Sequence, residues 1–440
     1  MAAASFVLVL VFFLLLSFPD IDNPRLASAL DATAADDDGP YRSERFSIVS
    51  YESLWHDYSP PAPPPSPPDP PSSSCEGDLG GTGDFNTLCE LHTSVQLSCD
   101  FFAKAHGSFV LYPDVVLSCS VAGCSIVVNL TGEIRIGRNA KIAAGTVRMQ
   151  AGNMSVAEGA AIDTVALAGD PPPQTSGVPT GTNGDGGGHG GRGASCVVKE
   201  GQTQEDSWGG DAYSWSTLMK PDSYGSKGSS TSMEKDYGGG GGGRVYLVVN
   251  DVIEVNGSIT ADGGEGGSLG GGGSGGSIFI SAAKMKGTGK ISASGGSGLA
   301  GGGGGRVSIA VFSRHDDPHV FVHGGRSFGC PENAGAAGTL YDAVPKSLIV
   351  SNHNLSTQTD TLLLEFPYQP LWTNVFIRNC AKVAVPLLWS RVQVQGQLSL
   401  LSGGMLAFGL TRYPYSEFEL MAEELLMSDS IIKLHQQLAY

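Results

Sequence analysis

Three aromatic side chains in a glycine-rich stretch are the part of this sequence that most resembles a binding site. Trp208, Tyr213 and Trp215 lie within the eight-residue segment Trp-Gly-Gly-Asp-Ala-Tyr-Ser-Trp. Aromatic faces stack on flat or apolar ligand surfaces, and sugar rings offer such a surface. We therefore expect these residues either to form a sugar-stacking platform or to pack a long loop onto the rest of the fold.

A second group combines imidazole and carboxylate side chains, which suit zinc or manganese. Its members are His315, Asp316, Asp317, His319 and His323. A proline and several glycines mark the segment as a loop, so the alternative is a solvated connector whose Asp and His side chains cap backbone groups. We favour the connector and predict no metal site.

Fragments of a catalytic pattern are also present. β-Helix glycosidases that act on pectin carry N-T-D, D-D, G-H-G and R-I-K, with carboxylates spaced for acid–base chemistry. This sequence has Gly188-His189-Gly190 and Asp316-Asp317, but in the reversed order and without N-T-D or R-I-K. We predict a noncatalytic protein without catalytic residues, and keep a β-helix polysaccharide hydrolase or lyase as the alternative.

Two glycine motifs could bind a cofactor or calcium, and neither is complete. Gly296-Ser-Gly-Leu-Ala-Gly301 matches a dinucleotide fingerprint, but a strand pattern follows it where that site needs a helix N-terminus. The repeats at Gly263 and Gly295 place Ser and Ala where calcium-binding β-rolls need a carboxylate. We expect no cofactor, and we expect the glycines to allow positive φ in loops between strands.

The N-terminus indicates the secretory pathway. Eleven apolar residues at 6–16 precede the small-residue site Ala27-Ser-Ala29, as in a signal peptide cleaved after Ala29. A membrane-spanning helix needs about 20 apolar residues, and a retained anchor is the alternative. A net charge of −17 with scattered basic residues argues against nucleic acid as a partner.

In a secreted chain, cysteines are expected to form disulfides and N-x-[ST] sequons to carry N-glycans. An even number of cysteines in a secreted chain indicates disulfides, whose connectivity stays open, and the crowding of the first five indicates a stapled cap. The disulfide candidates are Cys75, Cys89, Cys99, Cys119, Cys124, Cys196, Cys330 and Cys380. The predicted N-glycosylation sites are Asn129, Asn153, Asn256 and Asn354. Alternating residue types around Asn256 predict that its side chain points outward.

A repeating architecture must position these residues. Two glycine-bounded strands, at 257–264 and 289–296, share one pattern thirty-two residues apart, and a twenty-residue repeat relates 132–142 to 152–162. Alternating apolar residues predict half-buried strands, and twenty residues suffice for one coil of a parallel β-helix. We therefore predict an all-β, right-handed parallel β-helix with long glycine-rich loops, and keep a β-sandwich as the alternative.

The same alternation predicts side-chain directions. Ile259 and Ile291 are expected to face inward on parallel strands, with Ser258, Thr260 and Ser292 facing out. Six segments are expected along the chain: a signal peptide at 1–29, a disordered acidic and Pro-rich linker at 30–74, a disulfide-stapled cap with the first coils at 75–168, a glycine-rich excursion at 169–243, glycine-rich repeat coils at 244–345, and further β coils at 346–440. A solenoid needs a polar cap, and none follows the last apparent coil, so we expect a fragment or splice form.

Several motifs of this chain occur together in a known family. They are the Ser-Pro-Pro linker, Asp78–Gly81, Gly186–Gly193, Trp208–Trp215, Phe312–Asp317 and Leu371–Val375. The chain resembles the N-terminal part of large plant glycine-rich proteins of unknown function, often named ephrin type-B receptor-like, a label that these residues do not support. The resemblance implies no catalytic residues. It implies a membrane anchor only for longer members of the family, and we expect none to be encoded in this chain. We expect a secreted, extracellular or cell-wall protein with a structural or glycan-binding role, whose partner is a cell-wall glycan or an extracellular protein.

Overall fold

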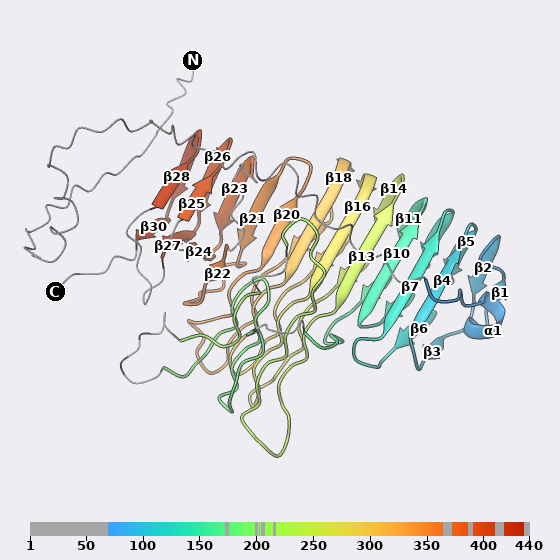
Figure 1. Ribbon diagram of the computed structural model, residues 1–440, viewed down its shortest axis with the longest axis horizontal. Coiled ribbons are helices and arrows are strands. Elements are labelled where there is room, and N and C mark those ends of the chain that lie inside the picture. The colour runs from blue at the N-terminus through green and yellow to red at the C-terminus, as the bar shows by residue number, and fades with distance from the viewer. Residues whose placement is uncertain are drawn as a thin grey trace, which may run out of the picture. The chain divides into compact units, whose positions relative to one another are not determined.

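The computed structural model describes most of the chain after the Pro-rich linker. The described residues are 69–434, with gaps at 172–175, 199–200, 202, 204–206, 214–216, 364–371, 386–389 and 410–417. The predicted signal peptide, most of the linker and Trp215 lie outside them. The one helix in the described part is α1 (Cys75–Leu79), and the other regular elements are strands, mostly in parallel pairs (Figure 1). The predicted all-β class is therefore confirmed.

Successive turns of the chain add strands to three parallel rows. The first row holds β4 (Phe101–Ala105), β7 (Ser125–Leu130), β10 (Thr146–Ala151), β13 (Arg244–Val249), the N-terminal parts of β16 (Ser277–Lys286) and β18 (Arg306–His315), and β20 (Thr339–Asp342). The second row holds β2 (Leu88–Leu91), β5 (Ser108–Leu111), β8 (Glu133–Ile136), β11 (Asn153–Val156), β14 (Val252–Val255) and the C-terminal parts of β16 and β18. The third row holds β3 (Val95–Leu97), β6 (Val116–Cys119), β9 (Lys141–Ala143), β12 (Ala161–Asp163), β15 (Ser258–Thr260), β17 (Lys290–Ser292) and β19 (His319–Phe321).

The two sequence repeats set the register of these rows. Ile134 pairs with Met154, twenty residues on, and Ile259 pairs with Ile291, thirty-two residues on. All four side chains are buried, so apolar ladders run through the core as predicted. Ser292, next to the inward-facing Ile291, is also buried, and its hydroxyl donates to Asp262 Oδ1 at 2.5 Å. A carboxylate of a neighbouring loop therefore covers this position, which burial alternation alone does not predict.

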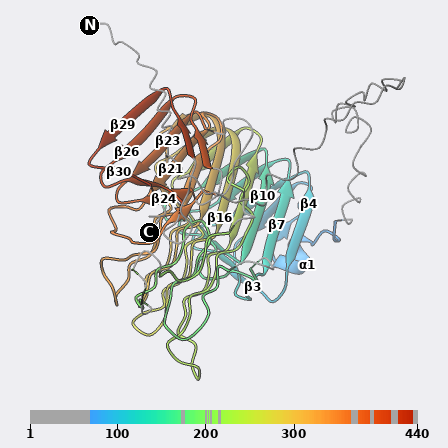
Figure 2. The same cartoon turned by 60° about the vertical axis from the view of Figure 1, so that its left-hand side comes forward.

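Four long loops leave the coil at the same corner, between the third row and the first. They span 164–243, 261–276, 293–305 and 322–338, and Figures 1 and 2 show them extending together away from the rows of strands. Backbone hydrogen bonds join loops that are far apart in sequence, such as Gly187 N to Gly272 O at 2.9 Å. We call residues 184–193, 207–213, 225–243, 261–276, 293–305 and 322–338 the glycine bundle.

Hydrogen bonds within the glycine bundle recur every third residue. Gly272 N donates to Ala300 O, and Gly275 N donates to Gly303 O, each at 2.9 Å. A polyproline II segment has three residues per turn and no internal hydrogen bonds, so its backbone groups point outward to neighbouring segments. The three-residue spacing therefore indicates a packed bundle of polyproline II-like segments, in place of ordinary connecting loops.

Close approach between these segments explains the glycine content. A Cβ added to Gly272 would lie 1.8 Å from Gly296 O, and one added to Gly338 would lie 1.9 Å from Gly305 O. Only two glycines of the bundle, Gly184 and Gly267, have positive φ. The expectation that the glycines serve positive φ is therefore wrong for most of the bundle. They are needed because no side chain fits, as at the axis of collagen.

Part of the excursion folds back over the outer face of the first row. Asp222 forms an ion pair with Arg148 at 2.7 Å, and Ser308 Oγ donates to Met219 O at 2.8 Å. Tyr224 Oη lies 2.6 Å from Thr146 Oγ1, and the two hydroxyls share a hydrogen bond. Residues 219–224 therefore cover strands of the first row.

The strand direction reverses near the C-terminal part of the chain. β20 pairs antiparallel with β21 (Ser347–Ser351), and the other antiparallel pair of named strands in the described residues joins β2 to β1 (Thr82–Gly83). This predominance of parallel pairs makes the β-sandwich alternative wrong. The later strands are β22 (Thr361–Leu362), β23 (Asn374–Arg378), β24 (Lys382–Val385), β25 (Ser390–Gln393), β26 (Gln397–Leu401), β27 (Met405–Phe408), β28 (Phe418–Met421), β29 (Glu424–Ser428) and β30 (Ile431–Leu434). They pair in parallel and enclose a second apolar core.

Candidate functional site

Three disulfides occur in the described residues. They are Cys75–Cys89, Cys119–Cys124 and Cys196–Cys330. The first two lie in the N-terminal part of the chain, where crowded cysteines predicted a stapled cap. Cys99 and Cys380 are unpaired, so the expectation that all eight cysteines form disulfides is wrong. Disulfides of this number indicate an oxidising compartment, such as the secretory pathway.

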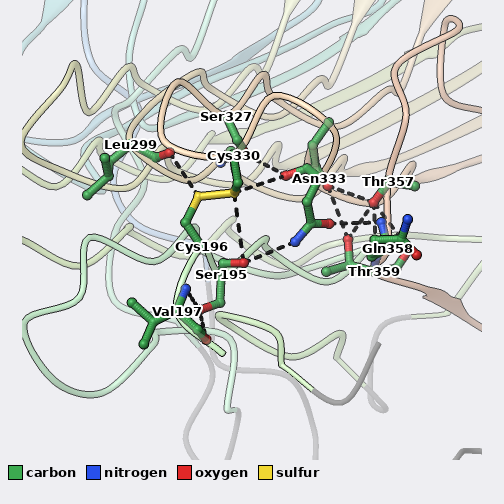
Figure 3. Close-up of a disulfide and its surroundings, with 12 residues drawn as sticks. Ser195, Cys196, Val197, Leu299, Ser327, Cys330, Asn333, Thr357, Gln358 and Thr359 are labelled. Atoms are coloured by element: carbon green, nitrogen blue, oxygen red, sulfur yellow. Dashed lines mark hydrogen bonds between the residues drawn. A yellow bond between two sulfur atoms is a disulfide. The ribbon is translucent and has the colours of Figure 1, made fainter. Parts of the chain in front are cut away.

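The Cys196–Cys330 disulfide anchors the glycine bundle (Figure 3). It joins residues 134 positions apart, one in the excursion and one in the loop that precedes β20. Asn333 beside it donates from Nδ2 to Ser195 O at 3.0 Å and accepts from Gln358 N at 2.8 Å. Covalent and polar contacts thus fix the excursion to two later segments of the chain.

Tyr213 is packed inside the glycine bundle. Its side chain is 2% exposed, its hydroxyl lies 2.5 Å from Ser226 Oγ, and its ring centroid lies 4.7 Å from that of His189. A sugar ring has no access to this face, so the assignment of Tyr213 to a stacking platform is wrong. Its role is the predicted alternative, which is to pack the loop onto the fold.

Trp208 is half-buried, and Trp215 lies outside the described residues. The Arg192 guanidinium lies 3.9 Å from the centroid of the Trp208 ring and covers one face of the indole. The Arg192 Nε donates to Asp211 Oδ1 at 2.8 Å, and its Nη1 lies 3.8 Å from Asp360 Oδ2. Trp208 is therefore the one described member of the aromatic group that keeps a partly open surface.

His189, the histidine of the Gly-His-Gly fragment, is fully buried. Its Nδ1 lies 2.8 Å from Gly275 O. Burial and the nearby Arg306 charge lower the pKa of His189 to about 3, so the imidazole is neutral at physiological pH. Asp316 and Asp317 are exposed beyond β18, and in the described residues neither contacts His189. The glycosidase-like fragments are therefore not brought together.

The His and Asp residues at 315–323 form no metal-binding group. His315, Asp316, Asp317 and His319 are exposed, whereas His323 is half-buried. Arg314 forms two ion pairs, one with Asp317 at 3.2 Å and one with Asp342 at 2.8 Å. Among the described residues, no three or more His, Cys, Asp or Glu side chains converge to hold a metal ion.

Two titratable groups near this loop have shifted pKa values. Burial raises the pKa of Asp342, with a contribution from Asp317, although Arg314 opposes the shift. Burial lowers the pKa of His323, whose ring stacks on that of His353 at 5.2 Å between centroids. The positive charge of Arg314 thus faces the carboxylates of Asp317 and Asp342, and these ion pairs connect the end of β18 to the end of β20.

The four sequons lie at the surface of the described chain. Asn153, Asn256 and Asn354 are exposed, and Asn129 is half-buried on the outer side of β7. The Asn256 amide donates to Glu254 Oε1 at 2.8 Å, so the predicted outward direction of this side chain is confirmed. A glycan is sterically tolerated at such positions.

Sequence reasoning missed an outward-facing ladder in the first row. Tyr246 and Phe279 are paired positions of β13 and β16, and their rings stack with centroids 4.6 Å apart. The Arg148 guanidinium lies 5.3 Å from the centroid of Tyr246 on the next strand. The repeated motifs Arg-Val-Tyr-Leu and Ser-Ile-Phe-Ile contained the signal. Phe279 and Arg148 flank Tyr246, so the ladder stabilises the strands and offers no open stacking face.

The fold and these contacts define a disulfide-containing protein of stacked parallel strands with a packed glycine bundle. No family model matches the chain, and neither the curated proteins nor the solved structures contain a match. In the described part of the chain, no helix has the length and apolar character needed to cross a membrane.

Proposed function

We propose that this protein is a noncatalytic extracellular or cell-wall-associated protein with a structural role, built as a right-handed parallel β-helix. One observation supports this function above the others. Three side chains of the excursion whose types are common in active sites, those of His189, Arg192 and Tyr213, are engaged in packing the glycine bundle. Right-handed crossovers are the rule between parallel strands, which supports the proposed hand.

A structural role also agrees with the surface and the covalent chemistry. Three disulfides brace the chain, and four surface sequons would carry glycans in the secretory pathway. A net charge of −17 opposes bulk attraction to an anionic polysaccharide, so a neutral cell-wall glycan or an extracellular protein is the proposed partner.

A localisation experiment tests this function. The chain, with its own N-terminus and a C-terminal fluorescent tag, would be produced in plant cells that are then plasmolysed. We expect fluorescence to stay in the wall when the cell membrane retracts. Fluorescence confined to the cytosol would contradict the proposal, and fluorescence that follows the membrane would support the retained-anchor alternative.

Glycan binding is a second candidate function, favoured by the partly open indole of Trp208. On a glycan array, Trp208→Ala should abolish binding if stacking supplies the contact, whereas the double variant Asp316→Asn/Asp317→Asn should bind normally. Release of soluble products from wall polysaccharide, lost in the double variant, would instead support the hydrolase or lyase alternative.

A further inference from the structure

An unpaired cysteine lies beside a disulfide at one corner of the N-terminal coils. Leu97 at the end of β3 pairs with Cys119 at the end of β6, so the two chain corners that follow are neighbours. Cys99 belongs to the first corner, and its carbonyl oxygen lies 4.0 Å from Cys119 Sγ. Cys119 is bonded to Cys124 in the second corner. The backbone of Cys99 therefore lies beside the Cys119–Cys124 disulfide.

The three cysteines differ in accessibility. Cys99 is exposed, whereas Cys119 and Cys124 are buried at 0% and 4% exposure. The two corners are held together beyond the cysteines, because Ser125 N donates to Asp100 Oδ1 at 2.9 Å. An exposed cysteine thus belongs to a chain corner that is held beside a buried disulfide.

We propose that Cys99, Cys119 and Cys124 form an intramolecular thiol–disulfide exchange site. The Cys99 thiol loses its proton to solvent, and the thiolate attacks Cys119 Sγ. A Cys99–Cys119 bond forms as the Cys119–Cys124 bond breaks, and the electron pair leaves on Cys124 sulfur, which then takes up a proton. Atoms and charge balance, and no external oxidant or reductant is consumed.

Loop length favours the exchanged disulfide thermodynamically. The Cys119–Cys124 disulfide closes a separation of 5 residues, whereas Cys99–Cys119 would close one of 20, the difference between the two residue numbers. A disulfide that closes a longer loop removes more freedom from the unfolded chain. The exchange would move the free thiol from exposed Cys99 to buried Cys124, and the surface thiol would be hidden.

Trypsin offers a direct test, because it cleaves after Lys104, between Cys99 and Cys119, whereas the chain has no Lys or Arg between Cys119 and Cys124. Cys99 lies in the tryptic peptide 46–104, whereas Cys119 and Cys124 share the peptide 105–135. The purified protein would be held at pH 8 for several hours, quenched in acid, unfolded in urea, alkylated, freed of N-glycans and digested. We expect a mixture in which some molecules link 46–104 to 105–135 and carry the alkyl group on Cys124.

Two variants and one control make the outcome decisive. Cys99→Ser should abolish both the cross-linked peptides and the label on Cys124, while Cys380→Ser should change neither. Cys124→Ser should form the Cys99–Cys119 disulfide in most molecules. Wild-type protein labelled only at Cys99 and Cys380, together with Cys124→Ser protein whose Cys99 and Cys119 both stay reduced, would overturn the proposal.

Discussion

Gly272→Ala is the most direct perturbation of the glycine bundle. The new Cβ would lie 1.8 Å from Gly296 O, whereas ordinary contact begins near 3.4 Å, so the two segments would have to separate by 1.6 Å (3.4 minus 1.8 Å). Gly272 N donates to Ala300 O, and Gly272 O accepts from Gly187 N, both at 2.9 Å. Ala300 belongs to the same segment as Gly296, so a displacement of that size breaks the hydrogen bond between Gly272 N and Ala300 O and leaves both groups unsatisfied. Each buried group left unsatisfied costs about 1–3 kcal/mol, so for these two groups we expect a loss of about 2–6 kcal/mol.

Gly329→Ala is the matched control at the tip of the same bundle. Its nearest neighbour would be Leu299 Cδ1 at 2.8 Å, the end of a flexible side chain that can rotate away, and the next would be Leu299 O at 3.1 Å and Cys196 Sγ at 3.3 Å, which need to shift by only a few tenths of an ångström. We expect its stability to stay within about 1 kcal/mol of wild type. Denaturant unfolding followed by near-ultraviolet circular dichroism gives both free energies. If Gly272→Ala proves as stable as wild type, or if both variants lose the same stability, close backbone packing is not what requires glycine.

Three further predictions address the core, the buried histidine and the covalent state. Ile259→Ala removes a fully buried side chain and should lower the free energy of unfolding by about 2–5 kcal/mol in the same assay; an unchanged value would contradict the ladder. The folded-state pKa of His189 is about 3, below the unfolded value near 6.5, so its contribution to stability is lost as the pH falls from about 6.5 to 3, by up to roughly 1.4 kcal/mol per unit. His189→Gln should remove this part of the acid destabilisation, and parallel pH profiles for the two proteins would contradict it. Peptide N-glycosidase should reduce the apparent mass of the secreted protein, and alkylation at pH 5 without reduction should label Cys99 and Cys380; labelling of all eight thiols would mean that the disulfides do not form.

The stacking of the strands could be predicted from the sequence, because the alternation of apolar residues and the length of the repeats determine which strand residues pair. The pairings of Ile134 with Met154 and of Ile259 with Ile291 follow directly from the repeat lengths. The antiparallel β20–β21 pair could not be predicted in this way. A hairpin and a further coil carry the same alternating pattern, and only long-range packing distinguishes them.

The candidate site was less predictable, because burial depends on which segments meet. Tyr213 and Trp208 are both aromatic and share a glycine-rich setting in the sequence, yet Tyr213 is enclosed by His189 and Ser226 while Trp208 stays partly open. The partners of both residues come from elsewhere in the glycine bundle. Glycine tracts carry no side-chain pattern, so the sequence does not indicate which segments of the bundle pack together. The spacing of the cysteines likewise does not indicate which six of the eight form the three disulfides.

The order of the bundle segments along the chain has a consequence for biosynthesis. Ala336 N donates to Arg192 O at 2.9 Å, across 144 residues of sequence (336 minus 192). A ribosome adding about 5–20 residues per second needs roughly 7–29 s to make that stretch. During this interval the excursion has been translated, but the partners of its backbone groups that lie in the last glycine loop, at 322–338, do not yet exist. The nascent excursion must therefore stay solvated or be held by chaperones until residue 338 has emerged, and the last glycine loop is the step that allows the bundle to close.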